Sequence, residues 1–218
     1  APEWANAGSL TALVSVPGTT PIQPQPRVLL TYDEHALYLA AELPLPKGSQ
    51  PAAAVAAHDG SVWEDDAVEL FVDPGRSRSE YFQFIANSAG ARWDSRGRDG
   101  SWDAEWRSAA TVNDGAWVVE IEVPFASIGK TPADGETWGV NVAWDRRTPA
   151  PLTASWGHVT EGLHQPSHFG QVRFAAKAPA VRPLGPNQLG EGAVQFIGDW
   201  RSAVPLDAHL QVVELTAE

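Results

Sequence analysis

Acidic side chains cluster between Val62 and Gly75, in a stretch that reads V-W-E-D-D-A-V-E-L-F-V-D-P-G. Carboxylates act as acid and base in glycosidases, where the two groups lie about 5–5.5 Å or about 6.5–9.5 Å apart. Glu69 and Asp73 fall on one face of a predicted strand but are four residues apart, which separates them by about 13 Å. That pair is too widely spaced for this chemistry. A pairing of Glu69 with Glu120 or Glu122 from another strand stays open.

The same stretch predicts the strand that positions these groups. Val68, Leu70 and Val72 alternate with Glu69 and its neighbours, which is the period-2 pattern of a strand with one apolar face. The apolar face indicates a core. The other face carries a carboxylate beside an aromatic ring, a few residues after Trp63.

Other catalytic and metal motifs are weak or absent in the sequence. The chain has no cysteine and no methionine, which excludes disulfides, thiolate metal sites and a methionine ligand for haem. No nucleophile elbow, P-loop or dinucleotide fingerprint occurs. His164 and His168 are four residues apart with His158 nearby, a spacing that a transition metal could use. Loop histidines exposed to solvent are the simpler interpretation.

The composition and charge of the chain argue against several classes of partner. The 218 residues carry a formal charge of −12, which argues against nucleic acid or an anionic membrane as a ligand. No apolar run approaches the ~20 residues of a membrane span. Ten tryptophans exceed the needs of a core of this size, so we expect some of them on the surface. The chain starts without methionine, and we expect a secreted or periplasmic, monomeric module excised from a longer protein.

Strand patterns recur along the chain with turn signals between them. An Asn113-Asp114-Gly115 turn joins the strongest predicted hairpin. Residues 88–103 are predicted to form a long loop, and no helical pattern of ten or more residues appears. The sequence therefore predicts an all-β fold, an antiparallel β-sandwich of the immunoglobulin-like or jelly-roll type. The predicted strands are 27–32, 36–43, 52–57, 67–73, 81–87, 104–112, 117–123, 137–145 and 171–174.

The composition changes near the C-terminus and predicts a domain boundary there. Residues 1–178 are expected to form the sandwich. Residues 179–218 begin with a segment rich in alanine and proline, typical of a linker. A possible hairpin of 193–197 with 206–215 follows, either as an extension of the sandwich or as the truncated start of another module.

Several motifs together resemble carbohydrate-binding module family 9. They are W-E-D-D-A-V-E-L-F-V-D-P, Y-F-Q-F-I-A-N, W-V-V-E-I-E-V-P-F, W-G-V-N-V and H-Q-P-S-H-F-G, in the order that the family has. The resemblance runs from about Trp4 to Phe174 and leaves out the C-terminal tail. It implies a sugar that lies between two tryptophans and is held by polar side chains of one sheet face.

The resemblance assigns part of a binding site to this sequence. It places the first stacking ring at Trp63, an acidic partner at Glu69 and an amide partner at Asn87. Positions 69, 85, 87 and 143 have the parity opposite to the core faces of their strands, so we expect them to share one exposed sheet face. Each residue also has a structural interpretation: Trp63 as loop packing, Glu69 as a buried acid bonded to a neighbouring strand, and Asn87 as a turn cap.

The family's remaining site residues are missing. Its arginine falls on Ile85, its glutamine on Ala143 and its second tryptophan on Leu163, next to His164. Trp93 and Trp102, in the predicted long loop, are the candidates to replace the missing ring. Because half of the site differs, we expect a ligand other than the glucose-type sugar of the founding members.

Calcium is a further implication of the resemblance, since family members bind it structurally. Carboxylate oxygens suit this ion. The candidate ligands lie in the acidic stretch and in the 88–103 loop: Asp59, Glu64, Asp65, Asp66, Asp94 and Asp99, with Asp103 beside them.

The predicted function is that of a non-catalytic carbohydrate-binding module. It would recognise a terminal sugar of a polysaccharide or oligosaccharide and target a covalently linked catalytic domain to it. One alternative is a structural or interdomain sandwich that has lost the sugar site. The other is a small enzyme acting on polysaccharides.

Overall fold

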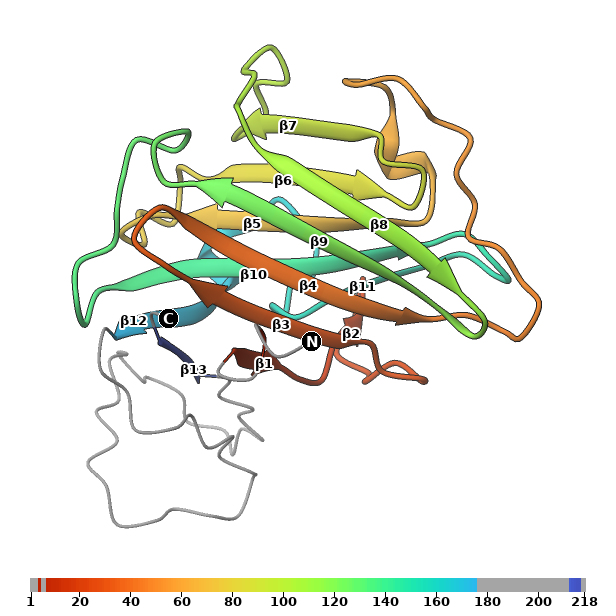
Figure 1. The fold of residues 1–218 in the computed structure, drawn as a ribbon. Helices are drawn as coiled ribbons and strands as arrows, with labels where there is room; N and C mark the ends of the chain where they lie inside the picture. Colours follow the sequence, from red (N-terminus) through yellow and green to blue (C-terminus); the bar gives the residue numbers. More distant parts are fainter. Residues whose placement is uncertain (1–3, 5–6, 176–211, 217–218) are drawn as a thin grey trace.

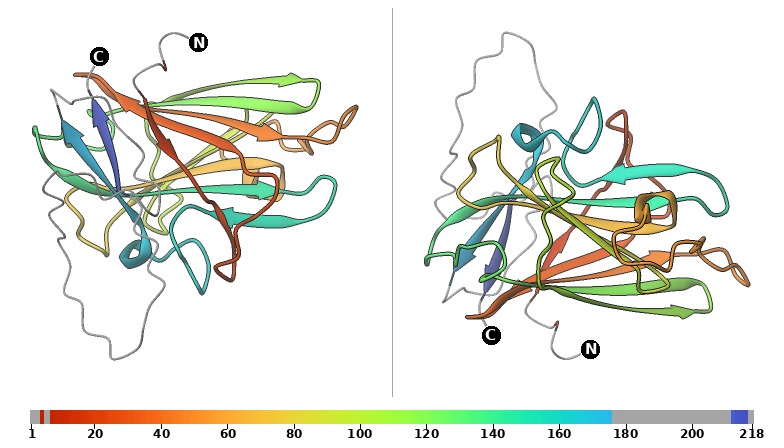
Figure 2. Two further views of the ribbon diagram at one scale, coloured as in Figure 1. Left: turned by 90° about the horizontal axis from the view of Figure 1, so that it is seen from below. Right: turned by 90° about the horizontal axis from the view of Figure 1, so that it is seen from above.

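Two stacked sheets make up the protein, as a computed structural model that describes Trp4, residues 7–175 and residues 212–216 shows. Figure 2 views the two layers from below and from above. The first sheet contains, in spatial order, β1 (Gly8–Leu10), β3 (Arg27–Tyr32), β4 (Ala36–Pro44), β9 (Ala116–Pro124) and β8 (Arg107–Asn113). The second contains β13 (Val212–Thr216), β12 (Gly170–Ala175), β10 (Thr137–Arg146), β5 (Ala67–Asp73), β6 (Phe82–Asn87) and β7 (Arg92–Arg96), while β11 (Leu152–Ser155) joins β10 to β2 (Val14–Ser15). The described 3-10 turns are η2 (Val62–Glu64) and η3 (Pro166–His168).

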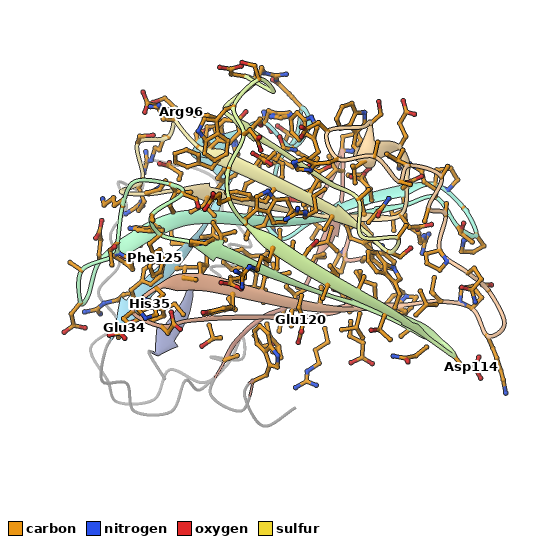
Figure 3. The ribbon with its side chains drawn as sticks, turned by 45° about the horizontal axis from the view of Figure 1, so that its top comes forward. Glu34, His35, Arg96, Asp114, Glu120 and Phe125 are labelled. Carbon is orange, nitrogen blue, oxygen red and sulfur yellow. The ribbon has the colours of Figure 1, made fainter. Side chains whose placement is uncertain are left out.

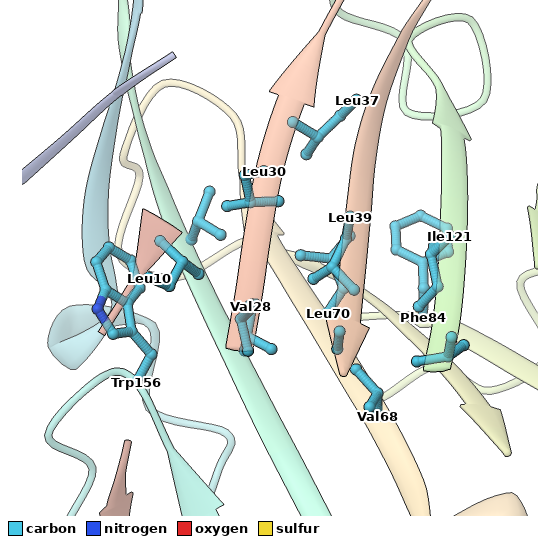
Figure 4. Close-up of a cluster of buried hydrophobic side chains, with 14 of the residues drawn as sticks. Leu10, Val28, Leu30, Leu37, Leu39, Val68, Leu70, Phe84, Ile121 and Trp156 are labelled. Atoms are coloured by element: carbon cyan, nitrogen blue, oxygen red, sulfur yellow. The ribbon is translucent and has the colours of Figure 1, made fainter. Parts of the chain in front are cut away.

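The core lies between the sheets and follows the alternation in the sequence. Leu30 and Leu39 of the first sheet face Val68 and Leu70 of the second, as Figure 4 shows. Each of these side chains is essentially inaccessible to solvent, and burial of each stabilises the fold by about 1.5–3 kcal/mol. The predicted all-β sandwich is confirmed. Four tryptophans complete the core as expected: Trp117, Trp138, Trp144 and Trp156.

Two local predictions differ from the structure. Residues 52–57 form no strand, because backbone N–H groups there bond to aspartate carboxylates instead of to a neighbouring strand. Conversely, the predicted 88–103 loop contains β7, which pairs Trp93 with Ile85 and Ser95 with Gln83. The sequence R-W-D-S-R has no apolar face to reveal this strand.

The C-terminal strand β13 runs parallel to β12 and extends the second sheet. Of the possible C-terminal hairpin, only 212–215 fall among the described residues. The boundary predicted at residue 179 lies outside them and stays a prediction. No helix in the described part of the chain has the length and apolar character needed to cross a membrane.

The outer face of the second sheet is buried, and this decides how a site can form. All seven residues of β5 are buried, on both faces of the strand. At one end, Val62 and Ala91 cover Ala67 and Ile85. Elsewhere on the face, Phe71 packs with Tyr81, Ala143, Phe169 and Leu163. Loops therefore fill most of the face that the sequence predicted to be open.

Candidate functional site

Trp63 is the large hydrophobic side chain that the described structure leaves exposed. Its exposed fraction is 40%, and it lies in η2, directly before β5. Val62, the residue before it, is fully buried and anchors the turn. The indole thus projects from a fixed support, which reduces the entropy lost when a ligand packs on it.

The rings of Trp93 and Trp63 meet edge to face. The two ring centroids are 5.2 Å apart, and the ring planes meet at 79°. A sugar held between two tryptophans needs two faces that are roughly parallel, so Trp93 does not form the opposite wall. Trp102, the other candidate for a second ring, instead packs on Phe82 with centroids 5.0 Å apart and joins the main core.

Arg147 fixes the turn that carries Trp63. Its Nη2 donates to the carbonyl of Trp63 at 2.5 Å, and its Nε donates to the carbonyl of Glu64 at 3.3 Å. The backbone N–H of Arg147 donates to Asp66 Oδ1 at 3.0 Å. Arg147 Nη2 also lies 3.6 Å from Asp145 Oδ1, and its side chain keeps 32% exposure. A partly exposed guanidinium therefore holds the backbone of the turn that carries the indole.

Behind Arg147, a row of buried polar side chains crosses the outer face. Glu69 accepts a hydrogen bond from Gln83 Nε2 at 2.6 Å and shares another with Asp145. Asp145 accepts from Thr153 Oγ1 at 2.7 Å. Burial raises the pKa of the Glu69 carboxyl well above its usual range, and the charge of Asp145 raises it further, against the opposing effects of Gln83 and Arg147. The row is internally satisfied and buried.

The side chain of Asn87 is also fully hydrogen-bonded within the protein. Its Nδ2 donates to the carbonyl of Val55 and to Asp65 Oδ2, both at 2.8 Å. Its Oδ1 accepts from the backbone N–H groups of Ala89 and Ala91 at 3.0 and 2.9 Å. Asn87 is fully buried, so it caps a turn and ties the 52–61 loop to the sheet.

The acidic cluster before β5 has a similar role. Asp65 accepts from the N–H groups of Ala54 and Val55, each at 2.9 Å. Asp66 Oδ2 accepts from Ala52 N at 2.5 Å. The oxygens of both buried carboxylates thus anchor the backbone of the 52–57 segment.

The remaining predicted metal ligands do not lie in a single group. Glu64 is exposed beside Trp63. Asp99 is exposed and accepts from Ser101 Oγ at 2.6 Å and from Ser101 N at 3.0 Å, which lowers the pKa of the Asp99 carboxyl. Asp59 and Asp94 are brought together with His58.

Leu163 and His164 lie in a separate cluster around Phe71. Leu163 is half-buried against Phe71, Tyr81 and Phe169. His164 Nδ1 lies 2.7 Å from the hydroxyl of Tyr81, and the rings of His164 and Phe71 meet edge to face at 5.8 Å. Burial lowers the pKa of His164, and Arg98 lowers it further. These two residues therefore cover the sheet and do not form a second wall for Trp63.

A family model described as "Carbohydrate family 9 binding domain-like" matches residues 1–177. The chain belongs to this family. It is a family of non-catalytic binding modules, and a search of curated proteins finds no significant match to this chain.

Solved structures share the family 9 fold. A module of Caldicellulosiruptor kristjanssonii in complex with glucose matches with a TM-score of 0.60 and 17% identity, over 83% of this chain and 91% of that one. The same organism's module in complex with cellotriose gives 0.59 and 19%, over 84% and 91%. A putative carbohydrate-binding protein from Bacteroides uniformis gives 0.58 and 19%, over 75% and 85%.

Three of the positions that the resemblance assigned to the binding face are neighbours in the structure. Glu69, Ile85 and Ala143 lie side by side across β5, β6 and β10, as their parity predicted. Their predicted exposure is wrong, because each is at most 3% exposed. Only Trp63, of the residues assigned by the resemblance, has a surface open to a ligand in the described structure.

Sequence reasoning missed Arg147 and Asp145. Arg147 follows β10 and reaches Trp63 across 84 residues of sequence, so no local pattern marks the contact. Asp145 does have a signal, because it shares the outward parity of Ala143 on β10. A charged residue at an outward position of a central strand is a candidate partner for Glu69 on the next strand.

Proposed function

We propose that this family 9 module binds carbohydrate on one side of Trp63. The observation that carries the proposal is the exposed indole, held on a turn whose backbone Arg147 fixes. A tryptophan face offers flat apolar area to the C–H side of a pyranose at low entropic cost. Arg147 and Glu64 supply donors and acceptors for the hydroxyls at the rim.

The ligand class is a polysaccharide or oligosaccharide with an accessible pyranose face. Family membership and the sugars in the related complexes support this class. Recognition of a chain end needs a second wall, and the edge-on position of Trp93 does not supply one. We therefore propose a platform that accepts internal sugar units, in place of the terminal sugar that the resemblance implies. Targeting of a linked catalytic domain outside the cytoplasm is part of the same proposal.

The geometry of the buried carboxylates favours binding over catalysis. Glycosidase carboxylates flank a cleft that holds the sugar and a water molecule. Glu69 and Asp145 are instead buried and hydrogen-bonded to each other. This pair has no room for a substrate between its members.

Replacing Trp63 by alanine is expected to weaken sugar binding at least about tenfold, a loss of about 1.4 kcal/mol. The measurement is affinity electrophoresis and calorimetry against soluble gluco-, xylo- and mannopolysaccharides. Trp63→Phe should retain part of the affinity, because it keeps an apolar ring.

Trp4→Ala is a matched control, since Trp4 lies on the other sheet and bonds to Glu120 at 3.0 Å. It should leave binding unchanged. Equal affinity of Trp63→Ala and the unmodified protein would exclude this site. If the unmodified protein binds no sugar in the panel, the structural or interdomain alternative is supported instead.

A further inference from the structure

A histidine and three aspartates converge next to β7. His58, Asp59 and Asp94 each offer one ligand atom, and these atoms lie within 4.8 Å of one another. His58 Nε2 is 3.8 Å from Asp59 Oδ1 and 3.6 Å from Asp103 Oδ1. The four side chains come from three segments: the loop before η2, β7, and the loop after β7.

The imidazole of His58 is oriented for a ligand. Its Nδ1 lies 3.1 Å from the backbone carbonyl of Arg92. A carbonyl oxygen can only accept, so Nδ1 carries the proton and Nε2 faces the carboxylates. Metal-binding histidines nearly always donate their second ring N–H in this way, which fixes the tautomer and the ring orientation.

Asp94 is equally fixed. It is 1% exposed, and its two oxygens accept from Trp106 Nε1 at 2.8 Å and from Ala104 N at 2.9 Å. Each carboxylate oxygen has a second lone pair that these bonds leave available. Buried N–H donors thus hold one carboxylate in place opposite an oriented imidazole.

We propose that His58, Asp59 and Asp94 form a site for a divalent transition metal of the zinc type, which the exposed side chain of Asp103 completes by turning toward the ion. A nitrogen ligand together with carboxylate oxygens suits zinc, whereas calcium takes oxygen ligands. Two ligands of a tetrahedral zinc ion, each about 2.1 Å from the metal, lie about 3.4 Å apart. The distances of 3.6 and 3.8 Å from His58 Nε2 to Asp103 and Asp59 exceed this value slightly, and the ligand atoms of His58, Asp59 and Asp94, which lie within 4.8 Å of one another, would close around the ion.

The bound ion would link the loop before η2 to β7 and to the loop after it. Gly100 of that last loop packs on the ring of Trp93, where an added Cβ would lie 3.0 Å from the indole. The metal would therefore stabilise the support of Trp63. This proposal does not depend on sugar binding.

The test uses protein stripped with EDTA and then titrated with ZnCl2, CoCl2 or CaCl2, followed by thermal melting and calorimetry. Zinc at a hundredfold excess over its dissociation constant is expected to raise the melting temperature by about 5 °C or more. Cobalt should bind at the same site and give the visible spectrum of a tetrahedral ion. Calcium should have little effect.

His58→Ala is expected to abolish the zinc-induced shift, and Asp103→Asn to weaken zinc binding about tenfold. His35→Ala is the matched control, because His35 also lies beside a carboxylate, Glu34, at 3.2 Å (Figure 3), but on an exposed turn where the second carboxylate, Asp33, accepts from backbone N–H groups and from Tyr38. An unchanged zinc response in His58→Ala would overturn the proposal. So would a calcium effect equal to that of zinc, or no zinc binding by the unmodified protein, which would assign His58 to plain ion pairs.

Discussion

Replacing Asp65 by alanine is expected to lower the free energy of unfolding by about 3 kcal/mol, because it removes the acceptor of three N–H donors, one of them buried and two part-buried. Asp65 is 3% exposed and accepts from Ala54 N, Val55 N and Asn87 Nδ2 at 2.8–2.9 Å. The 52–57 backbone has no strand partner, so these bonds replace a ladder there. The loss should appear in urea denaturation as a lower midpoint with an unchanged slope.

Glu64→Ala is the matched control for this prediction. Glu64 is the neighbouring acid, is exposed, and loses the same charge on substitution. Its effect should stay within about 0.5 kcal/mol. Asp65→Asn keeps one acceptor oxygen and should fall between the two. If Asp65→Ala and Glu64→Ala destabilise equally, the carboxylate of Asp65 does not anchor the loop.

The sandwich was predictable because strand alternation is a local property. Val68, Leu70 and Val72 alternate with polar residues, and the same period marks Trp138 to Trp144 on the neighbouring strand. Burial of the core favours one register strongly, since a shift by one residue would turn the apolar side chains outward. The parity of Glu69 and Ala143 was therefore also readable from the sequence.

The loops that cover the outer face of the second sheet could not be predicted from strand alternation. The loops that bury Glu69 and Asn87 reach them across large sequence separations, as the contact of Asn87 with Val55 across 32 residues illustrates. Each of these contacts depends on a loop path, and loop paths leave no periodic signal. The structural interpretations of Glu69 as a buried acid and of Asn87 as a turn cap are the ones that the contacts support.

The buried carboxyl pair of Glu69 and Asp145 should affect the thermal stability of the protein. Glu69→Gln is expected to raise the melting temperature at pH 8 by more than the roughly 2 °C that a surface substitution produces in a chain of this size. Glutamine can accept from Gln83 Nε2 through its oxygen and donate to Asp145 through its amide, so both hydrogen bonds are kept. The change removes only the buried charge.

The gain in melting temperature from Glu69→Gln should become smaller as the pH falls. Burial and the charge of Asp145 raise the pKa of Glu69 in the folded state above its unfolded value. Between the two values the folded protein binds a proton that the unfolded chain has lost, so stability falls as pH rises through this range. Below the usual pKa of a glutamate, both states are protonated and the advantage of Glu69→Gln should disappear.

Glu161→Gln provides the control, because Glu161 is an exposed glutamate in a loop. Its melting temperature should follow that of the unmodified protein at every pH. A Glu69→Gln variant that is less stable at pH 8 than at pH 4, relative to the unmodified protein, would show that the fold holds Glu69 as a carboxylate. In that case Arg147 and Gln83 outweigh burial, and the polar row behind Trp63 carries a net negative charge.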